Sequence, residues 1–128
     1  MARKSQSQPT PTEVEILRIL WETGPLTVRE VHQRFGAKRA VGYTGVLRVL
    51  QNMLEKGLVR RNEEGHAHIY EARDANRIKR QLLADLVRKV FAGSASQLVL
   101  HLLANQNATS KEIEEIERMV AEHRNKPK

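Results

Sequence analysis

Apolar residues recur every three to four positions between Gly42 and Lys56, which is the spacing of one face of an α-helix. At about 100° per residue, one broad face of this helix, bordered by Leu47, carries Val46, Val49, Leu50, Met53 and Leu54. The opposite side carries Thr44, Arg48, Gln51 and Glu55, flanked by Gly45 and Asn52. A helix with one apolar face is expected to dock on a domain. Gly57 is expected to end the helix in a left-handed conformation.

Two short strands are expected after this helix. We predict a strand at Leu58–Arg61, a polar turn at Asn62–Gly65 and a returning strand at His66–Ala72, with Tyr70 in the core. The outer side of the helix carries Arg, Gln and Asn, whose side chains suit the guanine and adenine edges in a DNA major groove. A helix of this kind followed by a basic hairpin is typical of a winged helix-turn-helix.

Two further helices are predicted upstream, and each begins with a capping box. Thr10 with Glu13 starts the first, and Thr27 with Glu30 starts the second. The second helix is short and ends at Gly36, as expected for the first helix of a helix-turn-helix pair. The helix that follows it is therefore the candidate recognition helix. Residues 1–9 are polar and aperiodic, and we expect them to form a disordered tail.

From Asp74 onward the pattern is helical, and three more helices are predicted. Ser94 to Gln97 and Thr109 to Glu112 both have the spacing of a capping box. These helices carry more apolar surface than so small a unit can bury, so we favour a symmetric dimer. In the alternative, the three helices cover the winged helix as one globule. The residues expected at the dimer interface are Leu82, Leu86, Val90, Leu98, Leu102, Ile113, Ile116 and Val120.

The expected fold class is mainly α with a small β-hairpin. A winged helix-turn-helix DNA-binding domain at residues 10–73 is followed by a three-helix dimerisation domain at residues 74–124. The chain has 128 residues, of which 40% are hydrophobic and 29% charged, as in an ordinary soluble protein. It has no Cys, which excludes disulfides and thiol catalysis. We find no secretory signal and no apolar run of membrane-spanning length, and we expect a cytoplasmic protein.

Positive charge concentrates on the candidate recognition helix and hairpin. The formal net charge is +7, and the stretch from Lys38 to Arg61 holds six basic residues against one acid, Glu55. A basic surface of this kind indicates a partner with a phosphate backbone, although a run of charged residues often forms only a solvent-exposed face. The expected DNA-binding residues are Lys38, Arg39, Tyr43, Thr44, Gly45, Arg48, Gln51, Asn52, Arg60, Arg61 and His66.

More specific predictions can be made for three of these residues. The Tyr43 ring is expected to pack inward, with its hydroxyl reaching a phosphate. Gly45 costs the helix about 1 kcal/mol relative to Ala. Close approach of the helix start to DNA would explain a glycine here, and so would neutral sequence change at a frayed helix start. His66 is expected to contact phosphates together with Arg60 and Arg61 of the hairpin.

Other function classes have weaker support. His66 and His68 share a strand face, but no third ligand is apparent, so we expect no metal and no cofactor. No nucleophile and base stand at a suggestive spacing and no phosphate loop is present, so we expect no enzyme. The alternative to a sequence-specific DNA-binding protein is a winged-helix protein-interaction module without specific DNA readout. The basic cluster argues against that alternative.

Several motifs in order and spacing resemble the penicillinase-repressor family, of the BlaI and MecI type, over nearly the whole chain from Thr10 to Glu122. The matching runs are Glu13-x-Glu15-Ile16-Leu17, Leu20-Trp21, Thr27-Val28-Arg29-Glu30-Val31-His32, Tyr43-Thr44-x-Val46-Leu47-x-Val49-Leu50, Lys56-Gly57-Leu58-Val59 and Gly65-His66-Ala67-x-x-Tyr70. Each run alone is weak, but together they are specific.

The resemblance implies a bacterial cytoplasmic repressor that binds a palindromic double-stranded DNA operator as a homodimer. Such proteins typically control β-lactam resistance genes, and are released by proteolysis in the dimerisation domain after a membrane-bound sensor detects antibiotic. Gly45 departs from the family, since many members have Thr there. His101-Leu102 stands where staphylococcal members are cut at an Asn-Phe bond, which makes it the possible cleavage site. A copper-responsive branch carries Cys pairs, which this chain lacks.

Overall fold

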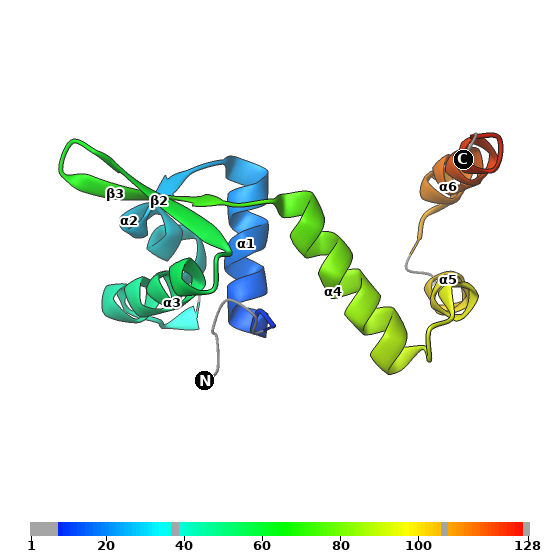
Figure 1. Cartoon of the computed structure of the whole chain (residues 1–128), viewed down its shortest axis with the longest axis horizontal. Coiled ribbons are helices and arrows are strands. Elements are labelled where there is room, and N and C mark those ends of the chain that lie inside the picture. The colour runs from blue at the N-terminus through cyan, green and yellow to red at the C-terminus, as the bar shows by residue number, and fades with distance from the viewer. Residues whose placement is uncertain (1–7, 37–38, 106–107, 127–128) are drawn as a thin grey trace. The chain divides into compact units, whose positions relative to one another are not determined.

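The computed structural model describes residues 8–36, 39–105 and 108–126 (Figure 1). Its elements, in chain order, are α1 (Pro11–Thr23), β1 (Leu26–Thr27), α2 (Val28–Val31), the π-helix η2 (His32–Gly36), α3 (Tyr43–Glu55), β2 (Val59–Glu64), β3 (Ala67–Ala72), α4 (Ala75–Val90), α5 (Ala95–Ala104) and α6 (Ser110–Arg124). The chain divides into two compact units, the first ending at Lys79 and the second beginning at Arg80. The division falls within α4.

Local sequence signals set most helix ends. The Glu13 amide donates to the Thr10 hydroxyl at 3.1 Å, and the Thr10 amide donates to the Glu13 carboxylate at 2.9 Å. Thr27 and Glu30 form the same reciprocal pair at the start of α2. Gly57 follows α3 with φ +78°, and the Leu58 amide then donates to the Met53 carbonyl. These two predicted capping boxes and the glycine that ends α3 are therefore confirmed, whereas at α5 the structure shows only the half in which Ser94 accepts from the Gln97 amide.

The sheet has three antiparallel strands in the order β1-β3-β2, so a third strand joins the predicted hairpin. Leu26 of β1 and Arg61 of β2 both stand opposite Tyr70. The predicted turn at residues 62–65 is wrong, because β2 continues to Glu64 and only Gly65 and His66 turn. Polar residues with low strand propensity stay in the ladder here because pairing with β3 outweighs that propensity.

The apolar face of α3 forms the centre of the first unit's core. Val46, Leu50 and Met53 are completely buried there, together with Tyr70 of β3. The rest of this core is contributed by α1, β1, α2, η2, β2 and the loop before it: Ile16, Leu17, Leu20, Leu26, Val28, Val31, Phe35, Leu58 and Val59. The first turn of α4 also belongs to this unit, because Ile78 is buried and the Lys79 ammonium lies 4.7 Å from the Trp21 ring centroid.

The second unit consists of the rest of α4, with α5 and α6. Ser94 caps α5 by accepting from the Gln97 amide, and Thr109 forms a complete capping box with Glu112. Among the described residues from Arg80 onward, none is buried. Helix formation in this unit is therefore well specified locally, while its apolar side chains remain half-buried or exposed.

Candidate nucleic-acid interface

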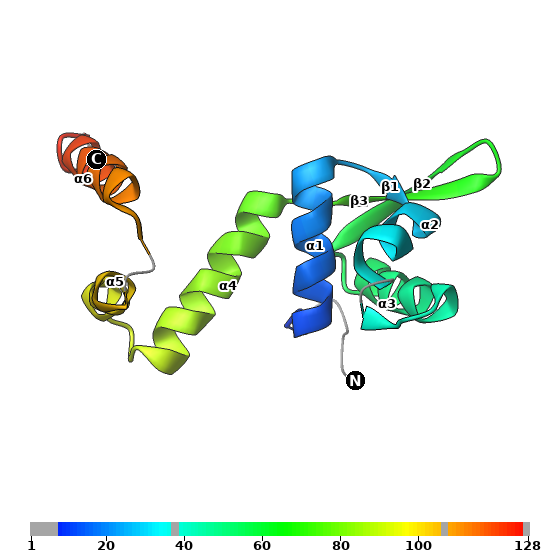
Figure 2. The ribbon, with the colours of Figure 1, turned by 180° about the vertical axis from the view of Figure 1, so that it is seen from behind.

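The outer side of α3 is exposed as the sequence pattern predicts. Thr44, Arg48 and Gln51 are all exposed, and their side chains lie on the side of α3 opposite the buried Val46 and Leu50. Figures 1 and 2 show α3 beside α2, with the β2–β3 hairpin extending past both helices. The helix is therefore held by its apolar face while its polar stripe faces solvent, which is the arrangement of a recognition helix.

Gly45 lies half-buried on the flank of this stripe, and the structure gives it a packing role. A Cβ at Gly45 would come within 2.9 Å of the Val41 Cγ1 atom. The segment before α3 is held in turn by His32, whose Nε2 donates to the Val41 carbonyl oxygen at 2.9 Å. The glycine thus allows the connector to lie close against the first turn of α3.

Tyr43 departs from the sequence-based expectation. Its side chain is 51% exposed, so the prediction that the ring packs inward is wrong. On a helical wheel Tyr43 falls near the apolar side, but it is the first residue of α3 and stands at the end of the helix. Its ring instead lines an open cleft with Val28 and Leu47.

Several basic residues of the expected cluster are paired within the first unit. Arg39 forms an ion pair with Glu15 of α1, and its guanidinium lies 4.9 Å from the Phe35 ring centroid. Lys56 pairs with the nearly buried Glu13 at 2.8 Å and is itself only 11% exposed, so it contributes a structural contact more than surface charge. Lys38 lies outside the described residues.

The hairpin divides its basic residues between two faces. Side chains alternate along a strand and directly opposite residues share a face. Arg61 stands opposite Tyr70 and so lies on the core-facing side, whereas Arg60 stands opposite Glu71 and pairs with it at 3.6 Å. His66 is exposed in the turn. The structure therefore brings Arg61, but not Arg60, onto the face that continues from α3.

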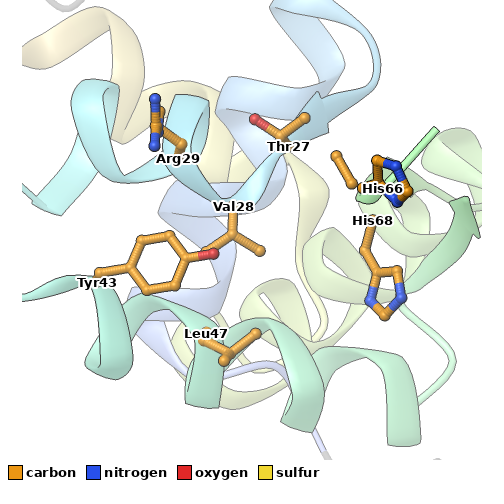
Figure 3. Close-up of a pocket in the computed structure, with 8 residues that line it drawn as sticks. Thr27, Val28, Arg29, Tyr43, Leu47, His66 and His68 are labelled. Atoms are coloured by element: carbon orange, nitrogen blue, oxygen red, sulfur yellow. The ribbon is translucent and has the colours of Figure 1, made fainter. Parts of the chain in front are cut away.

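A cleft of about 530 Å³ opens between α2, α3 and this face of the hairpin (Figure 3). We name it the α2–wing cleft; its lining is Thr27, Val28, Arg29, Tyr43, Leu47, His66, Ala67 and His68. The Tyr43 hydroxyl points into the cleft, and the two imidazoles approach it from the hairpin. Sequence reasoning missed Arg29 and His68. Arg29 could have been found from its place on the first helix of a helix-turn-helix, which crosses the DNA backbone.

Asn52 is half-buried beside the exposed stripe of α3. His68 forms a hydrogen bond with Glu63, which stands directly opposite it on β2, with 3.0 Å between Nε2 and Oε2. Within the described part of the chain, no group of three or more His, Cys, Asp or Glu residues is placed to hold a metal. Nor does any described helix combine the length and apolar character needed to cross a membrane.

The fold is that of a winged helix, and its α3 carries the exposed polar stripe of a DNA-binding member of that fold class. One solved structure, titled "Possible transcriptional regulator for arsenical resistance", aligns with a TM-score of 0.55 at 18% identity, over 86% of this chain and 100% of that one. A probable transcriptional regulator from Pseudomonas aeruginosa aligns with a TM-score of 0.51 at 19% identity, over 93% of this chain and 81% of that one. These likenesses show the fold.

The family follows from the sequence. The family described as penicillinase repressor matches residues 9–122, so the chain belongs to the penicillinase repressor family. It is 31% identical over 122 residues to the transcriptional regulator BlaI of Mycobacterium tuberculosis, covering 90% of this chain and 87% of that protein. It is 21% identical over 129 residues to the penicillinase repressor of Bacillus licheniformis, covering 98% of each. The chain is a DNA-binding transcriptional repressor of the BlaI type, and the resemblance seen in the sequence is confirmed.

Proposed function

We propose that two copies of this chain bind a palindromic operator and block transcription of a resistance-type or stress operon. Each copy places its α3 in the major groove of one half-site. The observation that carries this proposal is the division of α3 into a fully buried face and an exposed stripe of Thr44, Arg48 and Gln51. A helix held so firmly by one face keeps the other in a fixed register against base edges.

Arg48 is the residue we assign to base reading. A guanidinium donates two parallel hydrogen bonds to the O6 and N7 atoms of guanine, which gives about 1–3 kcal/mol of discrimination. Arg61 and His66 contact phosphates from the hairpin, and these contacts are shared by every DNA sequence. Arg60 adds to this sequence-independent affinity only after it exchanges its partner Glu71 for a phosphate.

The proposed dimer forms through the second unit. The interface includes Leu86, Val90, Leu102, Ile116 and Val120, which are between 40% and 63% exposed in the single chain. A groove of about 500 Å³ between α5 and α6, lined by residues such as Val99, Leu102 and Ile113, offers a seat for apolar side chains. A symmetric pair of recognition helices then matches the symmetry of a palindrome.

We also propose that a membrane-bound sensor protease, acting directly or through a further step, releases the operator by cutting in α5 near His101-Leu102. A protease needs extended backbone, so α5 must unfold locally before it is cut. Both residues of this dipeptide are exposed, and α5 has no buried residue to resist that opening. Cleavage here would remove α6 from the dimer and lower the affinity for paired half-sites.

The test is a titration of the purified full chain against its own upstream intergenic DNA and against random DNA at several salt concentrations. We expect tighter binding to the upstream DNA, two chains per protected dyad, and steep salt dependence because each neutralised phosphate releases counterions. Arg48→Ala should weaken operator binding by about 1–3 kcal/mol with little change on random DNA. Equal loss on both DNAs would overturn the assignment of Arg48 as the reading residue.

A further outcome decides between the repressor and a protein-interaction module. Equal affinity of the wild-type chain for upstream and random DNA, with footprinting of a fragmented genomic library also giving no preferred site, would overturn sequence-specific repression. The exposed stripe of α3 would then be a surface for another partner.

A further inference from the structure

The α2–wing cleft lies beside the proposed reading stripe but does not belong to it. Three elements meet there, with Arg29 from α2, Tyr43 from α3 and His68 from β3. All three side chains end in hydrogen-bond donors, whereas Val28 and Leu47 form an apolar wall. Hydrogen-bond donors that line an open cleft beside a recognition helix match the chemistry of a phosphate.

We propose that this cleft seats one phosphate of the DNA backbone, held by Arg29, the Tyr43 hydroxyl and His68. The inference rests on the proposed function, because it assumes that α3 enters the major groove. It assigns Arg29 and His68 to DNA contact and gives the exposed Tyr43 ring a purpose. A phosphate held from both α2 and the hairpin fixes the angle at which α3 enters the groove.

The Glu63 carboxylate competes with the phosphate for the imidazole of His68. Its carboxylate lies 3.0 Å from Nε2 of His68, on the face of the hairpin that turns toward the cleft. A phosphate entering the cleft takes the place of this carboxylate at the imidazole. Because Glu63 is the more exposed partner, at 75%, it swings into solvent without a buried charge being left behind.

The experiment uses the full chain and a duplex of random sequence, whose phosphates are the same as those of an operator. Arg29→Gln should lower affinity about tenfold and reduce the salt slope by about 0.9, because one phosphate loses its cation, and His68→Gln should also lower affinity. The matched control is Arg18→Gln on the exposed side of α1, which removes the same charge outside the cleft. Tyr43→Phe should lower affinity about threefold, whereas Tyr70→Phe in the core should leave it unchanged.

Removing the charge of Glu63, which competes with the phosphate for His68, is expected to raise the affinity for DNA. Glu63→Gln should raise affinity about threefold, compared with Glu22→Gln on α1 as the charge-matched control.

The proposal is overturned if Arg29→Gln and His68→Gln change affinity no more than Arg18→Gln, or if Glu63→Gln lowers affinity. Circular dichroism of each variant establishes that the exposed substitutions leave the fold intact. Failure of the proposed function is distinguishable, because loss of sequence preference appears only in the comparison of operator with random DNA. The cleft is tested on random DNA alone.

Discussion

The two units of this chain bury their apolar side chains to very different extents. Over the described residues, all fourteen buried hydrophobic residues lie in the first unit, and ten of the eleven exposed large hydrophobic residues lie in the second. Both units contain helices that begin with a complete capping box, such as α1 and α6, so local helix signals do not explain the difference. The first unit surrounds α3 with α1, α2 and a sheet, whereas the second has only helices that do not enclose one another.

The contrast between the two units holds even for residues of the same type. Leu50 and Leu102 are the same residue type on amphipathic helices, yet Leu50 is completely buried and Leu102 is 42% exposed. Contacts within a single chain are enough to bury Leu50. In the dimer that we propose, a second copy of the chain covers Leu102, which would account for the apolar pattern of α5. The first unit therefore encloses its own core, whereas under our proposal the second unit is completed by association with another copy.

The largest expected effect is the loss of the dimer. Leu102→Glu places two charges in a symmetric apolar interface, so the dissociation constant should rise at least about a thousandfold, roughly 4 kcal/mol. Sedimentation equilibrium measures this rise, with Gln97→Glu on the same helix as the control. If the variant retains the wild-type association, α5 does not contribute the interface and the contrast between the units has another cause.

The next effect distinguishes the units by their dependence on concentration. Leu50→Ala leaves a cavity in the first unit and should lower the free energy of unfolding by about 2–5 kcal/mol, independent of protein concentration. Leu86→Ala in the second unit should shift the unfolding midpoint only through association, so its effect should vary with concentration. Urea unfolding at two concentrations measures both. A concentration-dependent loss for Leu50→Ala would contradict the self-contained core.

A smaller loss is expected from the buried ion pair that joins the ends of α1 and α3. Lys56→Met leaves the Glu13 carboxylate, whose side chain is 4% exposed, without its countercharge and should destabilise the first unit by about 3 kcal/mol. The double variant Glu13→Gln with Lys56→Met should recover much of that loss, because no buried charge remains. Thermal unfolding of the single and double variants measures the coupling, and additive losses would contradict it.

The smallest effect concerns Gly45. Ala at this position gains about 1 kcal/mol of helix propensity, but its Cβ meets the Val41 side chain, so the net change should be below about 0.5 kcal/mol. Adding Val41→Ala removes that contact, so the gain from Gly45→Ala should be larger in the Val41→Ala background. A double-mutant cycle in chemical unfolding measures the difference. A full gain from Gly45→Ala alone would show that Val41 yields freely.

Much of the fold could be predicted because it depends on nearest neighbours in sequence. The capping boxes, the glycine that ends α3 and the apolar face of α3 each follow from spacing within a few residues. The hairpin register is different: the length of β2 depends on pairing with β3, which the polar run from Asn62 to Glu64 conceals. The third strand, β1, was missed because two residues carry no periodicity.

The candidate site was only partly predictable for the same reason. Thr44, Arg48 and Gln51 share a stripe on one helix, so the sequence is enough to group them. The pairing of Arg39 with Glu15 and of Lys56 with Glu13 joins residues more than twenty positions apart, and only tertiary packing creates it. The α2–wing cleft likewise requires three separate elements to converge.

The most direct measurement is the mass of the wild-type full chain in solution, by sedimentation equilibrium over a range of concentrations. A mass of twice 14.6 kDa, falling to the single-chain value on dilution or with Leu102→Glu, is the predicted result. A single-chain mass of 14.6 kDa at every concentration, with normal operator affinity, would contradict it. The exposed apolar residues of α4, α5 and α6 would then have to be covered by something other than a second copy.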